Sequence, residues 1–224
     1  MTDTRAPRRP ADDAPGGVGA RVRALFGPHE RAVSEAYRRA FVDLDDFVHV
    51  IAGWTDAPPR VLEIGCGEGA LAERLTERFP NADYHGIDVS DRLGRMYAGR
   101  PGARFEKVTA QTLAARAPHA YDLVVMADVL HHVPAPERDD VLRATADLTA
   151  PGGLIVFKDW DRRATPIHLA CWSSDRFLTG DPNVRYLSRE ELRGAAALLA
   201  GSGTVAAEAT VRPWAHNRAF AIRP

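Results

Sequence analysis

The stretch from Val61 to Leu75, VLEIGCGEGALAERL, is the feature that most narrows the possible folds of this 224-residue chain. It starts as a short apolar run, passes through glycines at positions 65, 67 and 69, and continues as an amphipathic helix. Glycine permits positive φ angles and leaves room for a ligand close to the main chain. A strand that turns directly into a helix also presents the free N–H groups of the helix N-terminus. The stretch therefore predicts an α/β domain with a ligand site at this turn.

Four further apolar runs follow the glycine turn, namely DYHGIDV, ARFEKV, YDLVVMADV and GGLIVFKDW. The segments between them, including 70–79 and 136–148, read as helices, and this alternation is typical of parallel strands that are covered on both faces. Near the C-terminus, Ser188 and Glu191 form a capping box before another helix. The last two runs, TVAAEATV and HNRAFAIRP, are expected to pair as an antiparallel hairpin. We therefore expect a Rossmann-like, doubly wound, mostly parallel seven-stranded sheet with helices on both faces.

The chain divides into three expected parts. Residues 1–18, rich in Pro, Arg, Asp and Gly, are predicted to form a disordered tail. Residues 19–57 are predicted to form an N-terminal helical cap, with one helix over 29–54 that carries apolar residues at helical spacing. Residues 58–224 form the expected catalytic domain. Within it, the segment at about 160–187 is long, irregular and rich in aromatic residues, which is typical of a functional loop.

The composition excludes several classes of partner. A formal net charge of -1 with dispersed basic residues does not fit nucleic-acid binding. The sequence has no run of 18 apolar residues and no apolar signal core at its N-terminus, so we expect a cytoplasmic protein without a membrane partner. Cys66 and Cys171 are far apart, and we expect both to be reduced. We expect a monomer or a homodimer.

The spacing around the glycines leaves two types of cofactor open. The pattern is G-x-G-x-G, whereas the dinucleotide fingerprint has its third glycine one position later, where this chain has Ala70. Asp88 follows the turn by about 20 residues and ends the next strand, where a carboxylate can accept hydrogen bonds from the ribose of any adenosine ligand. The protein could therefore also be a nicotinamide-dependent oxidoreductase.

In order and spacing, four motifs resemble the class I S-adenosylmethionine-dependent methyltransferases between about Val61 and Trp160. They are VLEIGCGEG, GIDVS, YDLVVMADVLHHVP and LTAPGGLIVFKDW. The resemblance implies S-adenosylmethionine as the cofactor and methyl transfer to a small molecule as the reaction. Our best prediction for the acceptor is a hydroxyl group in bacterial secondary metabolism. A protein that binds the sulfonium cofactor without transferring its methyl group is the remaining alternative.

The resemblance also implies positions for the cofactor. The methionine part would be bordered by Glu63, Gly65, Cys66 and Gly67. Asp88 would bind the ribose hydroxyls and Val89 would pack on the adenine. Ala127 and Asp128 would lie near the transferable methyl group. Many relatives have an aspartate after the third strand where this chain has Thr109, so Ala110 and Gln111 are expected to contact the adenine instead.

His131 and His132 are the predicted catalytic residues, with His131 preferred as the general base. They follow the fourth strand, at the end of the sheet where open α/β folds bind ligands, and an unperturbed imidazole has a pKa suited to proton removal near neutral pH. The same histidines can also be a structural feature of that turn. No third ligand lies at a recognisable spacing, so we expect no metal.

The acceptor is expected to contact the N-terminal helix and the irregular segment after the fifth strand, because both lie outside the shared core. Polar and aromatic side chains are mixed there, as in ligand pockets, although each can also be purely structural. The predicted acceptor contacts are Tyr37, Phe41, Asp159, His168, Trp172, Asp175 and Arg176.

Overall fold

The computed structural model describes residues 30–176 and 184–224 and contains one seven-stranded sheet in the order β3-β2-β1-β4-β5-β7-β6. The predicted tail at residues 1–18 and the first part of the predicted cap lie outside the described residues. The strands are β1 (Arg60–Ile64), β2 (Asp83–Asp88), β3 (Arg104–Lys107), β4 (Tyr121–Ala127), β5 (Thr149–Trp160), β6 (Thr204–Thr210) and β7 (Asn217–Arg223). All seven coincide with the runs identified in the sequence, so the predicted fold class is confirmed.

The sheet is parallel except at its C-terminal hairpin. Strand β1 pairs in parallel with both β2 and β4, β2 pairs in parallel with β3, and β4 pairs in parallel with β5. Strand β7 is antiparallel to both β5 and β6. The chain therefore builds outward from β1 to β3 and then returns to place β4 on the other side of β1. In such sheets, ligands bind at the carboxyl ends of the strands where this reversal occurs.

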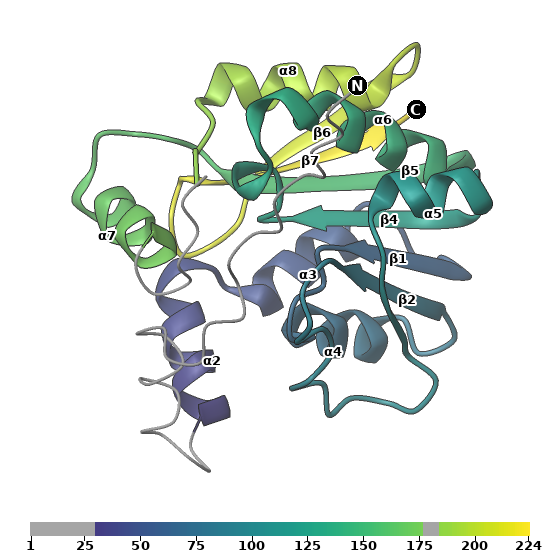
Figure 1. Cartoon of the computed structure of the whole chain (residues 1–224), viewed down its shortest axis with the longest axis horizontal. Helices are drawn as coiled ribbons and strands as arrows, with labels where there is room; N and C mark the ends of the chain where they lie inside the picture. Colours follow the sequence, from purple (N-terminus) through teal and green to yellow (C-terminus); the bar gives the residue numbers. More distant parts are fainter. Residues whose placement is uncertain (1–29, 177–183) are drawn as a thin grey trace, which may run out of the picture.

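Two layers of helices bury the faces of the sheet. Helices α5 (Ala110–Arg116), α6 (Arg138–Leu148) and α8 (Arg189–Ala200) cover one face, and α3 (Leu44–Ala52) and α4 (Ala70–Arg78) cover the other (Figure 1). The predicted capping box at the start of α8 is present, with Ser188 and Glu191 bonded reciprocally. Two 3-10 turns, η2 (Leu130–His132) and η3 (Ala135–Glu137), connect β4 to α6. Both predicted internal helices are confirmed, to within two residues.

The expected single helix over residues 29–54 is wrong, because the segment forms two helices. Helix α2 (Glu30–Phe41) extends away from the sheet, and α3 begins at Leu44 (Figure 1). Asp43 separates them in an extended conformation, and its side chain accepts hydrogen bonds from the N–H groups of Asp45 and Asp46. An aspartate in this position caps a new helix more favourably than it continues the preceding one.

The segment after β5 is more regular than expected, because it contains helix α7 (Pro166–Ser174). Thr165 caps this helix with its side chain, and proline occupies the first turn, where its missing N–H is not needed. Residues 177–183 lie outside the described residues. In the described ranges, no helix combines the length and the apolar character that crossing a membrane requires.

Candidate active site

The glycine turn between β1 and α4 has the geometry that its sequence predicts. Gly65 has a φ of 74°, and a Cβ atom there would lie 2.3 Å from Cγ2 of Val129. Gly69 has a φ of 94° and precedes the first residue of α4. A side chain at either position would therefore be strained or would collide with its neighbours. The turn places the main chain at Gly65 in the wall of a cleft at the switch point of the sheet.

The carboxylate of Asp88 is held at this turn by two backbone groups. The N–H of Gly67 donates to Oδ2 at 2.8 Å, and the N–H of Ser90 donates to Oδ1 at 2.7 Å. An ionised carboxylate offers about four lone-pair sites, so each oxygen retains capacity for a further donor. The arrangement fixes the orientation of the side chain and is suited to a ribose diol.

A cleft of about 540 Å³, which we name the switch-point cleft, opens at the carboxyl ends of β1, β2 and β4. It brings together six of the predicted cofactor residues: Gly65, Asp88, Val89, Ala110, Gln111 and Asp128. The side chain of Val89 is 67% exposed beside Asp88, which leaves an apolar surface available to a planar ring. Thr109, which also lines the cleft, uses its side chain to cap α5.

Four other predicted cofactor residues do not line the switch-point cleft. Glu63 is buried on β1, where the Tyr84 hydroxyl donates to its Oε2 at 2.6 Å. Burial raises the pKa of Glu63 to about 8. The thiol of Cys66 is also buried, and burial raises its pKa. Gly67 and Ala127 are the other two, and a role of these four residues in cofactor binding stays a prediction.

A second cavity of about 160 Å³, which we name the histidine cavity, adjoins the first. Asp128 and His132 line both cavities. Its lining residues come from the end of α2, the segment after β4, strand β5, the last turn of α7, the segment before α8 and the start of β7. Its wall contains Arg38, Phe41, Val42, Asp128, His131, His132, Lys158, Trp160, Cys171, Asp175, Tyr186 and Asn217.

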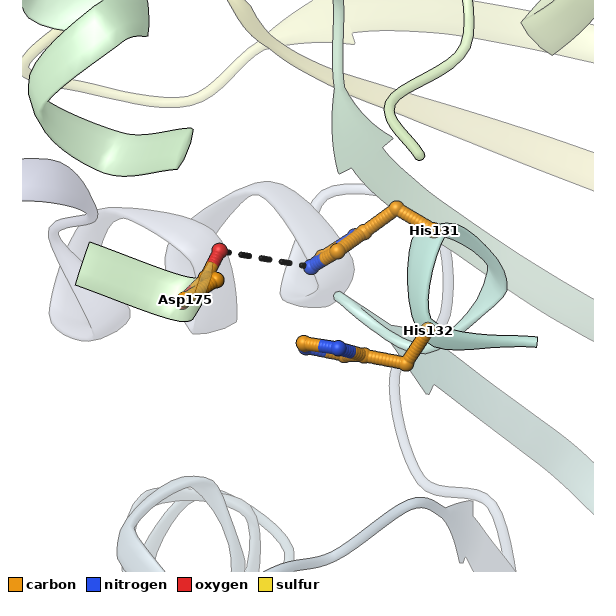
Figure 2. Close-up of side chains that lie close together, drawn as sticks. All are labelled: His131, His132 and Asp175. Atoms are coloured by element: carbon orange, nitrogen blue, oxygen red, sulfur yellow. Dashed lines mark ion pairs between the residues drawn. The ribbon is translucent and has the colours of Figure 1, made fainter. Parts of the chain in front are cut away.

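His131 is fixed in this cavity by a buried carboxylate. Its Nδ1 lies 2.6 Å from Oδ1 of Asp159, and its ring stacks on Tyr186 at a centroid distance of 4.5 Å. If Nδ1 carries the proton and donates it to Asp159, Nε2 is left as the acceptor. Nε2 points toward the carboxylate of Asp175 at a distance of 3.8 Å (Figure 2).

The surroundings of His131 favour its protonated form. Burial disfavours the imidazolium, but the attraction of Asp159, Asp128 and Asp175 outweighs that effect and raises the pKa of His131. Burial acts to raise the pKa of Asp159, but the attraction of His131 and the hydrogen bonds to the carboxylate have the larger effect, so the pKa of Asp159 is lowered. The pair can therefore accept a proton and stabilise the cation that results.

Lys158 and Asp128 form a second ion pair that was not predicted from the sequence, in which the lysine is buried and the aspartate is partly exposed. The Lys158 ammonium donates to both oxygens of Asp128, at 2.8 and 2.6 Å, and its side chain is only 1% exposed. The signal in the sequence was a lysine within the apolar run LIVFKDW. A charge placed inside a central strand requires a partner.

The predicted acceptor residues do not all lie in one place. Phe41 and Asp175 line the histidine cavity, and their contact with the acceptor stays a prediction. Asp159 does not line this cavity, because it is fully buried and acts on the cavity only through His131. A direct contact between Asp159 and the acceptor stays a prediction.

His168 and Trp172 lie elsewhere, because α7 has two faces. Residues 168 and 172 share one face and line an outer cleft of about 670 Å³, whereas residues 171 and 175 share the face toward the histidine cavity. The expectation that both faces contribute to one pocket is wrong. Among the described residues, Arg176 lines none of these three cavities. The side chain of Tyr37 lies outside the described part of the structure.

The fold brings a third potential metal ligand, Asp175, close to His131 and His132. Ligand atoms of His131, His132 and Asp175 all lie within 4.8 Å of one another (Figure 2). The reason for expecting no metal, the absence of a third ligand, therefore does not hold. However, the carboxylate of Asp175 already accepts a hydrogen bond from the Tyr186 hydroxyl, and the two imidazole rings contact each other at a centroid distance of 4.1 Å with an interplanar angle of 45°.

Known proteins resemble this chain in sequence and in fold. A family model described as a methyltransferase domain matches residues 35–199. The ubiquinone biosynthesis O-methyltransferase of Burkholderia orbicola (strain MC0-3) is 36% identical over 132 residues, which are 54% of this chain and 55% of that protein. The enzyme with the same name in Ralstonia nicotianae is 33% identical over 148 residues, 62% of this chain and 60% of that protein. The chain thus spans little more than half the length of these relatives.

Solved structures extend the likeness of fold to most of the chain. The mitomycin 7-O-methyltransferase MmcR has a TM-score of 0.65 at 16% identity, covering 95% of this chain and 62% of that chain. A protein of Pyrococcus horikoshii OT3 has a TM-score of 0.63 at 16% identity, covering 84% of this chain and 91% of that chain. Because the family model covers well over half of the sequence, the dinucleotide alternative is set aside. The chain belongs to the methyltransferase-domain family, in the class I group that uses S-adenosylmethionine.

Proposed function

We propose that this protein transfers a methyl group from S-adenosylmethionine to a hydroxyl oxygen of a small molecule. The observation that carries the proposal is the junction of two cavities, which share Asp128 and His132. One cavity contains the glycine turn and the carboxylate of Asp88, which can bind the ribose of a nucleoside. The other contains an oriented imidazole and has the size of a small acceptor.

In this proposal, the cofactor occupies the switch-point cleft. Asp88 accepts hydrogen bonds from the ribose hydroxyls with the lone pairs that Gly67 and Ser90 leave available. Val89 packs on the adenine, and Ala110 and Gln111 lie at its edge. Glu63, Cys66 and Gly67 are proposed to border the methionine part of the cofactor, and Ala127 is proposed to lie near the transferable methyl group.

The acceptor would occupy the histidine cavity, with its hydroxyl directed at the methyl group across the junction. Methyl transfer is an in-line displacement, and the alignment of both reactants can supply about 7 to 11 kcal/mol of the barrier. A new O–C bond forms as the S–C bond breaks, and the cationic sulfonium becomes a neutral thioether. The hydroxyl proton must leave during the same step.

His131 is the proposed acceptor of that proton, at Nε2. Asp159 fixes the ring through Nδ1, and the three surrounding carboxylates stabilise the imidazolium that forms. A base positioned in this way contributes a factor of about 100 to 10,000. His132 lines both cavities, and we assign it the positioning of the acceptor at the junction.

The acceptor class follows from the size of the cavity and from the relatives. A cavity of about 160 Å³ fits a small molecule or one end of a larger one. The curated relatives are named as O-methyltransferases, which favours oxygen as the nucleophile. We retain a bacterial secondary metabolite as the acceptor, and a ubiquinone precursor is the competing acceptor that the relatives' names offer.

The experiment is to incubate the protein with S-adenosylmethionine and a panel of hydroxylated small molecules, and to measure S-adenosylhomocysteine. We expect acceptor-dependent release that His131→Ala reduces strongly while cofactor affinity stays nearly unchanged. If wild-type protein binds the cofactor but releases no product with any acceptor, it is a binding protein without methyl transfer. Undiminished turnover in His131→Ala would remove this residue from the mechanism.

A further inference from the structure

Arg38 is a cation in the wall of the histidine cavity that the proposed reaction does not use. It belongs to the last turn of α2, and its side chain is 27% exposed. It lines the same cavity as His131 and Asp175 but approaches from the N-terminal helix rather than from the sheet. A guanidinium carries five N–H donors and no acceptor, so it requires oxygen partners where water is scarce.

The described residues neutralise Arg38 incompletely. Its ion-pair partner among them is Glu35, at 3.6 Å, whereas a charge-assisted hydrogen bond is about 2.7 to 2.9 Å long. Both oxygens of Glu35 are also held at 3.1 Å by Arg74. Glu35 is therefore shared between two guanidinium groups, and the closer of them is Arg74.

Burial and repulsion both act against the charge of Arg38. Burial is the largest influence and lowers the pKa of Arg38, Arg74 lowers it further, and Glu35 partly compensates. The other cation of the cavity, Lys158, is in a different position, because Asp128 accepts from it with both oxygens. Lys158 keeps only one of its three N–H donors, so Arg38 has more hydrogen-bonding capacity to offer a ligand.

The cavity is also polarised. Arg38 approaches from α2, whereas Asp128, Asp159 and Asp175 surround His131 on the side formed by the sheet and α7. On the histidine side, Lys158 is paired with Asp128 and His131 with Asp159, so Arg38 exerts the stronger attraction on a negative group of the acceptor. Such an acceptor would bind in one orientation, with its hydroxyl toward His131.

We infer that Arg38 forms a carboxylate-binding subsite, so that the acceptor is a hydroxylated carboxylic acid. The inference rests on the proposed function, because it assumes that the histidine cavity holds the acceptor. The planar guanidinium matches a carboxylate with two parallel hydrogen bonds. The cavity, at about 160 Å³, is smaller than typical ligand pockets of about 300 to 1,000 Å³, so the acid group and the reactive hydroxyl lie on one compact unit. Phe41 and Trp160 supply aromatic walls for it.

The test is calorimetric titration of benzoate into the full chain with S-adenosylhomocysteine already bound. We expect saturable binding to the wild type, a loss of about ten-fold or more in Arg38→Ala, and a smaller loss in Arg38→Lys, which keeps the charge but not the fork. Arg39→Ala is the matched control, since Arg39 is adjacent on the same helix but its side chain is 68% exposed. Benzamide, the neutral analogue, should not distinguish Arg38→Ala from the wild type. Thermal melting of each variant checks that it is folded.

The outcomes separate this inference from the proposed function. If benzoate does not bind the wild type, or binds Arg38→Ala equally well, the subsite is refuted, whatever the enzyme methylates. If binding depends on Arg38 but no hydroxylated acid supports release of S-adenosylhomocysteine, the subsite stands and the proposed function fails. Arg38-dependent methylation of a hydroxybenzoate, with KM raised more than kcat is lowered in Arg38→Ala, would support both.

Discussion

Replacing Glu63 with glutamine should abolish the loss of folding stability that the ionisation of Glu63 causes at high pH. The carboxyl group is buried, accepts a hydrogen bond from Tyr84, and has a pKa raised from 4.5 to about 8 by burial. Between these two values the folded protein keeps a proton that the unfolded chain releases, so stability falls as pH rises. At about 1.4 kcal/mol per pH unit, the full contribution is about 5 kcal/mol, an upper bound if the site relaxes when the carboxyl ionises.

The assay is urea unfolding of the wild type and Glu63→Gln between pH 5 and pH 9. Glutamine remains neutral and can still accept from Tyr84, so the two proteins should be about equally stable near pH 5. The variant should become more stable than the wild type by several kcal/mol at pH 8 to 9, where the unfolded chain has fully released the Glu63 proton and the folded protein is losing it. Glu77→Gln, on the exposed surface of α4, is the control and should follow the wild type. Parallel pH profiles for the wild type and Glu63→Gln would refute the reasoning.

Three further predictions concern the histidine cavity. The raised pKa of His131 implies that kcat increases with pH through a midpoint above 6.5. Asp159→Asn should lower that midpoint and reduce kcat by about 100-fold or more without changing cofactor affinity. A pH profile that does not move in this variant would contradict the role of Asp159. Asp128→Ala should destabilise the protein by about 3 kcal/mol, measured by urea unfolding, because it leaves Lys158 buried without its partner. Adding Lys158→Met to this variant should recover most of the lost stability. A double variant that is no more stable than Asp128→Ala would contradict the pairing. Chelation with EDTA should leave turnover unchanged because Asp175 already bonds Tyr186, whereas stimulation by Zn²⁺ or Mn²⁺ would identify a metal centre formed by the two histidines and Asp175.

The parts of the fold that the sequence predicted are those with local causes. The glycine turn, the apolar strands and the capping box at Ser188 each depend on residues within a few positions of one another. The carboxylate at Asp88 could be placed because parallel strands bring their carboxyl ends to the same edge of a sheet. The break at Asp43 also had a local signal, an aspartate followed by a new apolar period, which the prediction of a continuous helix overlooked.

The histidine cavity could not be assembled in this way, because its contacts join distant segments. Asp159 lies 28 positions after His131 in the sequence and bonds to its ring. Tyr186, which follows α7 in the sequence, stacks on the same ring. Which face of α7 turns inward depends on the packing of Cys171 with Trp160 and Tyr186, not on local periodicity. Arg38 was missed because an arginine on an N-terminal helix is usually solvated, and only the fold brings it to an enclosed wall.

Calorimetric titration of S-adenosylhomocysteine into the wild type and Asp88→Ala is the most direct test of the central claim, because it requires no knowledge of the acceptor. One equivalent should bind the wild type, and Asp88→Ala should weaken binding by about 1.5 to 3 kcal/mol, the value of hydrogen bonds to a charged group. Asp91→Ala, whose carboxylate is 73% exposed three residues further on, should bind like the wild type. Absence of saturable binding to the wild type, or equal affinity in Asp88→Ala, would contradict a nucleoside site at the glycine turn.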